Sequence, residues 1–518
     1  MSWMVHLLKC IAITQIIICC AGIFCQSPNG DKDNFHQGLR DYQSNFTLLS
    51  SMEWANGSSS NPFMSMVGTV GYSVTTGDVD SDGSPEIITT SLDYNETSWF
   101  QYHFQASVRV WKFSEQLELI GERVWYGDPE EGATPNVIKT FSWENTTYIL
   151  TGGSLDFKDS PSMADIRIWK YFSGHIILVN NVSWRDFQDK DSSVNYLQVC
   201  DVNDDGFLEI IVAGSIKWTE NGTKHRMASL SVWKIQEDLS LNLIDKKIWW
   251  DNSTNNTGTL YVDIDDLNND GIKEIVVGGF TGYVDSGQNK TKAQITVWHL
   301  LASGLVKIKD VSWIDVNSCT ISTITLYDIN SDGYKEIIAG GTNKNVVIAG
   351  EISVWNYELF QICRMQFYID PQSTTHRDCW VWDLACEDFD SDGSPEIVVC
   401  GTSSGPSGGT SSTYWGFLSS FTFAGNNLSM EAKYYWLDRE ETEISQMCFQ
   451  DLNGDSHFEI ITIGTTSDVE SGIQHVYAKL WIWEYKNVPV SEISWIFLDF
   501  IALLPVVYTI YFYPKIFD

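Results

Sequence analysis

One short acidic phrase occurs six times along the chain, and such a repeat restricts the fold strongly because equivalent units build one body. The copies are DVDSDGSPEII from Asp78, DVNDDGFLEII from Asp201, DLNNDGIKEIV from Asp266, DINSDGYKEII from Asp328, DFDSDGSPEIV from Asp388 and DLNGDSHFEII from Asp451. Their first residues are 123, 65, 62, 60 and 63 positions apart. Since the first interval is twice the others, we expect a degenerate seventh copy at Phe141–Gly153, which keeps the strand pattern without the acids.

A second phrase, apolar and ending in Trp, recurs with the same period, at Trp111, Trp169, Trp233, Trp298, Trp355 and Trp483. The segments alternate β-branched or aromatic residues with polar ones, and Gly, Asn, Asp and Ser separate them. This period of two is typical of strands, and no interior segment keeps a helical period. Four strands in each of seven repeats predict an all-β fold, a seven-bladed β-propeller over residues 45–490 with repeats of about 62 residues.

The segment Asn45–Trp54 resembles the fourth strand of a blade, and the last repeat contains only the first three strands. We therefore expect this N-terminal strand to complete the last blade and to close the ring, because neither end alone satisfies its backbone hydrogen bonds. Trp495 is the alternative for the same place in the blade.

The acidic phrase follows the pattern D-x-[DN]-x-D-G-x-x-E, which brings side-chain oxygens at positions 1, 3 and 5 to one side of a tight loop. A carbonyl at position 7 and Glu at position 9 complete a shell of roughly six to eight oxygens, which suits Ca²⁺. Gly at position 6 permits a positive φ. We expect about six structural Ca²⁺ ions, with the ligands Asp78, Asp80, Asp82, Ser84, Glu86, Asp201, Asn203, Asp205, Phe207, Glu209, Asp266, Asn268, Asp270, Ile272, Glu274, Asp328, Asn330, Asp332, Tyr334, Glu336, Asp388, Asp390, Asp392, Ser394, Glu396, Asp451, Asn453, Asp455, His457 and Glu459.

Solvated turns are the alternative for a single phrase of this kind, but six copies in one period, each followed by Glu, favour metal binding. We expect the sixth loop to bind most weakly because Ser456 replaces the Gly, and the repeat around Asn145 to bind no ion. The formal net charge is −35, from 67 Asp and Glu against 32 Lys and Arg. A chain this acidic repels phosphate backbones, so we expect no nucleic-acid partner.

The two ends of the chain carry targeting signals. Residues 1–25 place one Lys before an apolar run, as in a secretory signal peptide, with a membrane anchor as the alternative. Residues 495–513 form an apolar run of 19 residues with one acid, which is long enough for a C-terminal transmembrane anchor. A packed last strand and a cleaved lipid-anchor signal are the alternatives. With ten N-x-Ser/Thr sequons, these signals predict a secreted or cell-surface glycoprotein.

On its repeated DxDxDGxxE loops, each followed by an EIIxxG-type strand, the chain resembles the FG-GAP/VCBS family, the seven-bladed propeller at the head of integrin α chains. The resemblance covers residues 45–490 and implies Ca²⁺ on one face of the ring, with ligands met on the opposite face. The literal Phe-Gly and Gly-Ala-Pro phrases are absent, and six loops are acidic where integrins typically have three or four. Integrin identity is therefore not implied.

The face opposite the acidic loops carries the long connections between second and third strands. These include Ser91–Gln105, Ser215–Met227 and Thr402–Gly416. We expect aromatic residues in these connections to bind a protein or glycan ligand, unless they fill the central channel: Trp99, Tyr102, Trp218, Tyr414 and Trp415.

The sequence contains no HExxH pair, GxSxG elbow or P-loop, and its His residues, among them His103, His225 and His376, are scattered. The expectation is therefore an extracellular recognition or adhesion module that is not an enzyme. The alternative is a carbohydrate-active protein, either a lectin or a polysaccharide lyase. That alternative predicts a concave aromatic cleft, with a His, Lys or Arg beside carboxylates if the cleft is catalytic.

Overall fold

The computed structural model describes residues 45–55, 66–98, 101–126, 132–157, 159–250, 254, 256–315, 317–345, 347–369, 378–406, 412–470 and 473–486. All of them lie in one compact unit, Gly38–Asp518. These residues form 28 strands and no helix, so the all-β prediction is confirmed. A membrane-spanning helix is not found among the described residues. The segments 1–25 and 495–513 lie outside them, and the signals expected there stay predictions.

Five sheets have four strands each, antiparallel and in chain order. The first two contain β6 (Ala133–Trp143), β7 (Thr146–Phe157), β8 (Ser160–Phe172) and β9 (His175–Trp184), then β10 (Asp191–Cys200), β11 (Glu209–Glu220), β12 (Thr223–Ile235) and β13 (Leu241–Trp249). The other three contain β14 (Thr257–Asp265), β15 (Glu274–Asp285), β16 (Gln288–Leu301) and β17 (Gly304–Trp313); β18 (Ser318–Tyr327), β19 (Glu336–Lys344), β20 (Ile348–Trp355) and β21 (Gln361–Phe367); and β22 (Asp378–Glu387), β23 (Glu396–Pro406), β24 (Ser412–Ala424) and β25 (Asn427–Trp436).

The sixth sheet has eight strands and contains both ends of the described chain. It is formed by β1 (Phe46–Trp54), β2 (Met66–Gly77), β3 (Glu86–Ser98), β4 (Gln101–Phe113), β5 (Leu117–Trp125), β26 (Glu441–Gln450), β27 (Glu459–Glu470) and β28 (Ile473–Tyr485). Its two halves are joined by a three-residue parallel pairing between β2 and β28. At that pairing a Cβ on Gly68, whose φ is 138°, would lie 1.7 Å from the carbonyl oxygen of Val476, so only glycine fits.

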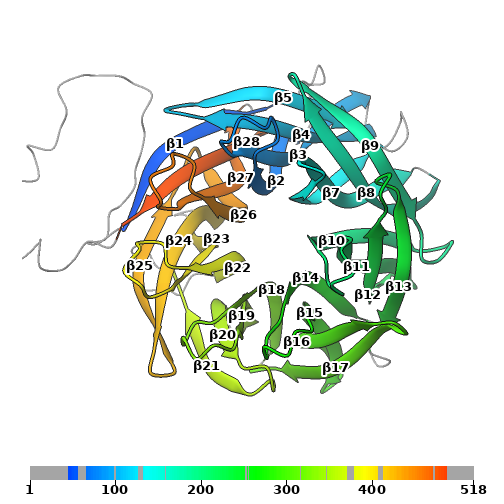
Figure 1. Ribbon diagram of the computed structural model, residues 1–518, viewed down its shortest axis with the longest axis vertical. Coiled ribbons are helices and arrows are strands. Elements are labelled where there is room, and N and C mark those ends of the chain that lie inside the picture. The colour runs from blue at the N-terminus through cyan, green and yellow to red at the C-terminus, as the bar shows by residue number, and fades with distance from the viewer. Residues whose placement is uncertain are drawn as a thin grey trace, which may run out of the picture. The chain divides into compact units, whose positions relative to one another are not determined.

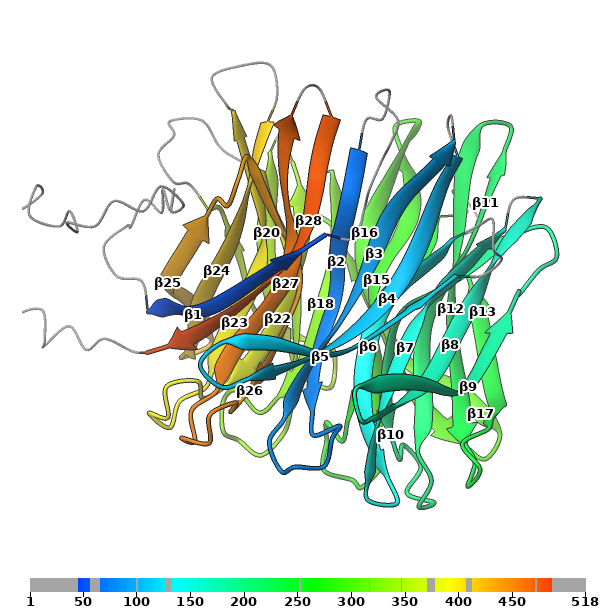
Figure 2. The ribbon, with the colours of Figure 1, turned by 90° about the horizontal axis from the view of Figure 1, so that it is seen from above.

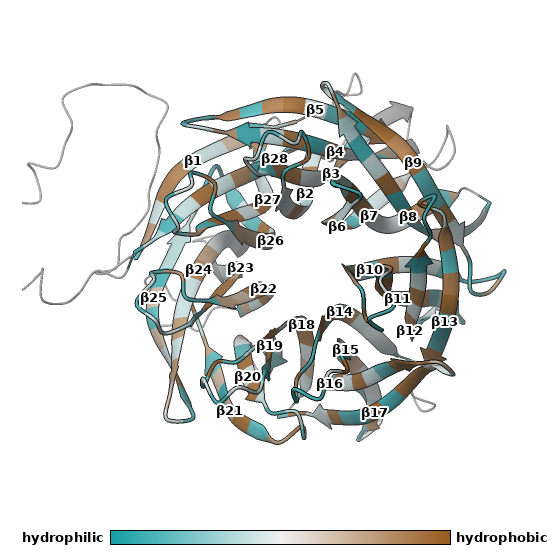
Figure 3. Cartoon of the chain, in the orientation of Figure 1, coloured by the Kyte–Doolittle hydropathy of each residue, from teal (hydrophilic) through white to brown (hydrophobic). Residues whose placement is uncertain are grey.

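The first strands of successive sheets contact one another in a closed cycle, β2, β6, β10, β14, β18, β22, β26 and β2 again. Figure 1 shows the sheets around a common centre, and Figure 2 shows the strands crossing from one rim to the other. Figure 3 shows hydrophobic and hydrophilic residues mixed along the strands. Second strands such as β11 are buried on both faces over most of their length, as expected for a sheet that packs between two neighbours.

A ladder of aromatic pairs runs around the ring and joins each fourth strand to the third strand of the next sheet. Six pairs are Trp on Trp, with ring centroids 4.6–5.2 Å apart, and the seventh is Phe367 on Phe421 at 5.0 Å. The Trp pairs are Trp54–Trp111, Trp125–Trp169, Trp184–Trp233, Trp249–Trp298, Trp313–Trp355 and Trp436–Trp483. Tilted aromatic pairs at this distance contribute about 0.5–1.5 kcal/mol each beyond their burial. The Trp repeats of the sequence therefore bind neighbouring sheets together.

The expected closure by the N-terminal strand is confirmed. β1 pairs antiparallel with β28, from Phe46 opposite Tyr485 to Trp54 opposite Ala478. Phe46 is 3% exposed, and its ring lies 5.1 Å from that of Tyr485. At the other end of β1, Trp54 packs on Trp111 of the first repeat. A single strand from the start of the chain thus completes the last repeat and contacts the first.

Cysteine thiols and sequon asparagines are the groups of this chain that can be covalently modified. The seven cysteines among the described residues are unpaired: Cys200, Cys319, Cys363, Cys379, Cys386, Cys400 and Cys448. Asn45, the first sequon residue, is only 9% exposed, and its Nδ2 donates a 3.5 Å hydrogen bond to the hydroxyl of Tyr485. A glycan does not fit there, whereas the sequon residues Asn145, Asn181, Asn221, Asn289 and Asn427 are exposed.

Polar side chains from the first strands cross-link the centre of the ring. The hydroxyl of Tyr196 donates to that of Tyr261 at 2.6 Å, and Tyr261 donates to Asp383 at 3.3 Å. Thr323 donates to the same Asp383 oxygen at 2.8 Å, and the Nζ of Lys139 lies 4.9 Å from the ring centre of Tyr196. These residues of β6, β10, β14, β18 and β22 therefore link five successive sheets through their first strands.

Asp263, also on β14, accepts hydrogen bonds from the Nε2 of Gln198 at 3.2 Å and from the backbone of Leu326 at 3.1 Å. Burial raises the pKa of Asp263 to about 6. Its pKa in the unfolded chain is about 3.9. Between about pH 4 and pH 6, Asp263 is therefore mostly protonated in the folded protein and mostly ionised in the unfolded chain. The stability that this proton contributes is complete below about pH 4 and lost as the pH rises through about 6.

We expect Asp263→Asn to remove part of this slope. Between pH 4.5 and 6.5 in excess calcium, the unfolding free energy of the wild type should fall relative to that of the variant by on the order of 2 kcal/mol. Urea unfolding at the two pH values measures the difference. Only the pH dependence of the unfolding free energy tests the assignment, because the amide of the variant has one acceptor oxygen fewer than the carboxylate and so changes stability at every pH. Parallel curves for the two proteins would contradict the assignment.

Candidate functional site

The six acidic loops each join the first strand of a repeat to the second, as the sequence predicts, and all fold alike. In the first loop, Asp78 accepts hydrogen bonds from the backbone of Asp82 and of Gly83, both at 3.1 Å, and Asp82 accepts from Ser84 at 2.9 Å. The same three bonds recur in the other five loops. In the sixth loop Ser456 takes the turn position with φ of 71°, a left-handed conformation that favours glycine.

The closing Glu of each loop is buried. Glu86, Glu209 and Glu336 are at most 2% exposed, and one carboxylate oxygen of each has no hydrogen-bond partner among the described residues. Burial, with a smaller contribution from the loop aspartates, raises the pKa of all three to about 7. A buried carboxylate with an unsatisfied oxygen is costly, and a bound cation would supply both the missing contact and the opposite charge. The loop residues therefore fit a divalent cation.

Two of the six loops gather their acids most tightly. One oxygen from each of three carboxylates lies within 4.8 Å of the other two in the clusters Asp78, Asp80, Glu86 and Asp388, Asp390, Glu396. Both loops have Asp at position 3. Where Asn stands there, Asn330 and Asn453 donate their amides to the closing Glu at 2.9 and 2.7 Å. In the third loop, His299 contacts an oxygen of Glu274 at 2.7 Å. The first and fifth loops thus form acidic clusters able to hold a metal ion.

These two loops differ in the cations that the chain itself provides. In the first, Lys112 forms an ion pair with Asp82 and lies 3.7 Å from Asp80. In the fifth, the residue opposite Glu396 on the next strand is Thr422, which carries no charge. Burial and the nearby Asp390 raise the pKa of Glu396 to about 8. Of these two loops, the fifth therefore depends more on an external cation.

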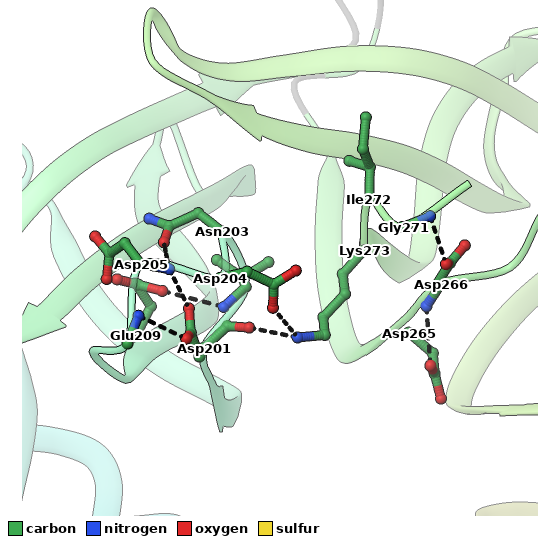
Figure 4. Close-up of polar contacts among 12 residues, drawn as sticks. Asp201, Asn203, Asp204, Asp205, Glu209, Asp265, Asp266, Gly271, Ile272 and Lys273 are labelled. Atoms are coloured by element: carbon green, nitrogen blue, oxygen red, sulfur yellow. Dashed lines mark hydrogen bonds and ion pairs between the residues drawn. The ribbon is translucent and has the colours of Figure 1, made fainter. Parts of the chain in front are cut away.

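Neighbouring loops are also linked to one another. Figure 4 shows Lys273 of the third loop reaching the second loop, where its Nζ lies 2.8 Å from Asp204 and 2.7 Å from the carbonyl of Asp201. The degenerate repeat has no such loop, because β6 and β7 are joined by a tight turn with Glu144 and Asn145 at positive φ. The expected degenerate copy at Phe141–Gly153 thus keeps the strand pattern, as the end of β6 and the start of β7.

The residues expected to bind a ligand are not all brought together. Trp99 lies outside the described residues, and the same holds for the side chain of Tyr102. Tyr414 and Trp415 are half-buried and pack within their own sheet, with Trp415 edge-on to Tyr435 at 6.1 Å. Trp218 is half-buried and lines a surface cleft, with the Nζ of Lys190 5.1 Å from its ring centre. The connection Ser215–Met227 is mostly a regular hairpin of β11 and β12, where the sequence suggested a long loop.

The cleft beside this hairpin has a volume of about 330 Å³. Its lining contains two stacked rings, Trp218 and His225, whose centroids are 5.1 Å apart at an interplanar angle of 26°. The Nδ1 of His225 is buried and has no hydrogen-bond partner among the described residues. The full lining is Asp191, Lys217, Trp218, Thr219, Lys224, His225, Arg226 and Asn256.

Three basic residues and one acid meet in this cleft of a strongly acidic protein. Burial, followed by the charge of Arg226, lowers the pKa of Lys217, and burial lowers the pKa of Arg226. The nearby acids, Asp156 and Asp191, both accept hydrogen bonds from Ser162. The hydroxyl of Ser162 donates to Asp156 at 2.7 Å, and its backbone donates to Asp191 at 2.9 Å. The sequence named Trp218 and His225 but missed Lys217, Arg226 and Asp191, although a basic residue on each side of this aromatic pair was a visible signal.

No family model matches the chain, and no curated protein matches it. Among solved structures, an exotype rhamnogalacturonan lyase is similar over 85% of this chain and 76% of its own, at 11% identity and a TM-score of 0.45. A rhamnogalacturonan lyase from Bacillus licheniformis is similar over 86% and 76%, at 13% identity and a TM-score of 0.40. An α-L-arabinofuranosidase from Fusarium graminearum is similar over 75% and 97%, at 12% identity and a TM-score of 0.41.

These neighbours correct one expectation. A non-catalytic recognition or adhesion module that is not an enzyme was expected, whereas the named structures are carbohydrate-active enzymes, the class of the alternative. All TM-scores are below 0.5, so the choice of a site depends on the residues of this chain alone. The cleft at Trp218 has the composition that the alternative predicts, an aromatic platform with His, Lys and Arg beside a carboxylate.

Proposed function

We propose that this chain is a secreted or cell-surface carbohydrate-active protein that binds saccharide in the cleft at Trp218. The observation that carries the proposal is the stacked pair Trp218 and His225 in a cleft with Lys217, Arg226 and Asp191. An aromatic face packs against the apolar face of a sugar ring, and the polar groups around it fix the hydroxyl groups. His225 lines the same cleft beside Trp218 and is the candidate for proton transfer to or from a bound sugar.

The acidic loops form the second part of the proposal. We assign Ca²⁺ as the cation, with up to six ions, because loops of carboxylate, amide and carbonyl oxygens suit this ion. We expect the fifth and first loops to bind Ca²⁺ most tightly and the sixth loop to bind it most weakly. The fold then corresponds to seven four-stranded blades, counting the eight-stranded sheet as two, as in the FG-GAP/VCBS resemblance. The cations hold the scaffold, and the chemistry on saccharide belongs to the cleft.

The test is binding and cleavage of a panel of polysaccharides by the purified chain. We expect Trp218→Ala to weaken binding by about 2 kcal/mol, or about thirtyfold, because a central aromatic contact is lost. Calorimetry measures the affinity, while new reducing ends and ultraviolet absorption by unsaturated ends distinguish hydrolysis from elimination. Trp382→Ala is the matched control, since Trp382 is 44% exposed on β22, away from the cleft. Equal losses in both variants, or no binding to any saccharide, would refute the proposal.

A further inference from the structure

The charges in the cleft at Trp218 restrict its ligand further than the aromatic rings do. Lys217 on β11 and Arg226 on β12 are directly opposite each other in the antiparallel register. Side chains in such a position share one face of the sheet with Cβ atoms roughly 5 Å apart, and like charges there are destabilising. The chain thus places two cations side by side at the rim of the ring.

The protein neutralises these cations only in part, because the charges of Asp191 and Asp156 counter some of the effect of burial on the pKa of Lys217. Among the described residues, no carboxylate lies within ion-pair distance of Lys217 or Arg226, although Asp191 stands opposite Lys217 in the register. The guanidinium of Arg226 instead lies 5.5 Å from the ring centre of Phe280. Asp191 and Asp156 both accept their hydrogen bonds from Ser162. Both cations are half-buried, so water compensates them incompletely.

Most other lysines of the ring are paired with acids, for example Lys112, Lys234 and Lys335 on the opposite rim. In a chain of net charge −35, two adjacent, half-buried and unpaired cations are the exception. Unfavourable charge arrangements of this kind are typical of binding sites, where stability is given up for function. An incoming anion would remove the repulsion and take hydrogen bonds from both side chains.

From this juxtaposition we infer that the cleft recognises an acidic saccharide, whose carboxylate or sulfate group binds between Lys217 and Arg226 while its ring lies against Trp218. The inference depends on the proposed carbohydrate function and names its substrate class. The chain's overall negative charge repels polyanions in general. Recognition is therefore confined to polymers with a sugar ring that brings its anionic group into this cleft.

The experiment measures binding of four polymers by calorimetry: polygalacturonate, its methyl-esterified neutral form, dextran sulfate and unsubstituted dextran. The variants are Lys217→Met and Arg226→Met, and Lys307→Met is the matched control, since Lys307 is exposed and paired with Asp310. We expect each cleft variant to lose about tenfold or more in affinity for the anionic polymer that binds. The same variants should bind neutral polymers unchanged, and the control should bind all four as the wild type does.

Thermal melting of the free variants provides a second readout. Because Lys217→Met removes a like-charge neighbour, its midpoint should rise, whereas loss of a merely structural lysine would lower it. Neutral polymers bound as tightly as anionic ones, or undiminished anionic binding in both cleft variants, would overturn the acidic-saccharide inference and leave the carbohydrate function standing. If no saccharide binds, the proposed function fails and the inference with it. Preference between polygalacturonate and dextran sulfate identifies the anionic group.

Discussion

Removing divalent cations with EGTA is expected to lower the melting temperature by roughly 5 °C, and added calcium to restore it. A site at a hundredfold excess over its Kd contributes about 2.7 kcal/mol, so the first and fifth loops together contribute about 5 kcal/mol. The unfolding entropy of about 2.1 cal/mol/K per residue converts this into the stated shift for a ring of this size. Differential scanning calorimetry with and without EGTA measures it. Equal midpoints would remove the metal assignment.

Loop variants separate the bound ion from a general salt effect. Asp388→Asn should abolish about half of the calcium-dependent shift, because Asp388 belongs to one of the two acidic clusters and the residue opposite its closing Glu396 is the uncharged Thr422. Asp204→Asn is the matched control, since Asp204 is exposed, stands at a non-ligand position of the second loop, and has φ of 56°, which Asn tolerates. A calcium response that falls equally in both variants would contradict specific binding by the fifth loop.

Removing β1 should have the largest effect of any change in the chain. Without residues 45–54, β28 loses a nine-residue partner, and the contacts of Phe46 with Tyr485 and of Trp54 with Trp111 disappear. We expect the truncated chain to lose its cooperative melting transition, because the last repeat keeps an open edge and the ring has no closure. Calorimetry and far-ultraviolet circular dichroism report this directly.

Point variants in the same strand keep the test informative when the truncated chain does not fold. Phe46→Ala should cost about 3–5 kcal/mol, because a fully buried ring is removed. Leu49→Ala, in the same strand but 42% exposed, should change stability by no more than about 0.5 kcal/mol. A truncated chain that melts like the wild type would show that closure lies elsewhere, with Trp495 as the alternative partner of β28.

Much of the fold was predictable because its signals are local and repeated. The acidic phrase, the aromatic residue near the end of each third strand and the aromatic residue of each fourth strand all recur with one period. The period did not reveal which of these residues contact each other. Trp125 packs on Trp169 of the next repeat, and six equivalent aromatic pairs lie around the ring. Contacts between sheets depend on how the ring closes, which no single repeat encodes. The role of β1 was predictable only because the last repeat lacked a strand.

The candidate site was predictable in part. The spacing of the acids predicts the loop ligands. It does not predict how the loops differ in cation affinity, because that depends on cross-strand neighbours such as Lys112 and Thr422. Trp218 was singled out as an exposed aromatic, whereas Lys217 and Arg226 gained meaning only from the register that sets them opposite each other. Trp415 was expected to bind a ligand, as Trp218 was, but it packs against Tyr435 within its own sheet. Without that register, the sequence does not show which charged residues lie opposite each other on neighbouring strands.

The closure by β1 has a mechanical consequence. Phe46, at the beginning of β1, is opposite Tyr485, at the end of β28, and the backbone of Lys486 donates to the carbonyl of Asn45 at 2.9 Å. The two ends of the ring therefore leave it side by side. A force that pulled them apart would load the inter-strand bonds one after another, as in unzipping, and not all together, as in shear. The ring would thus yield readily to tension on its ends.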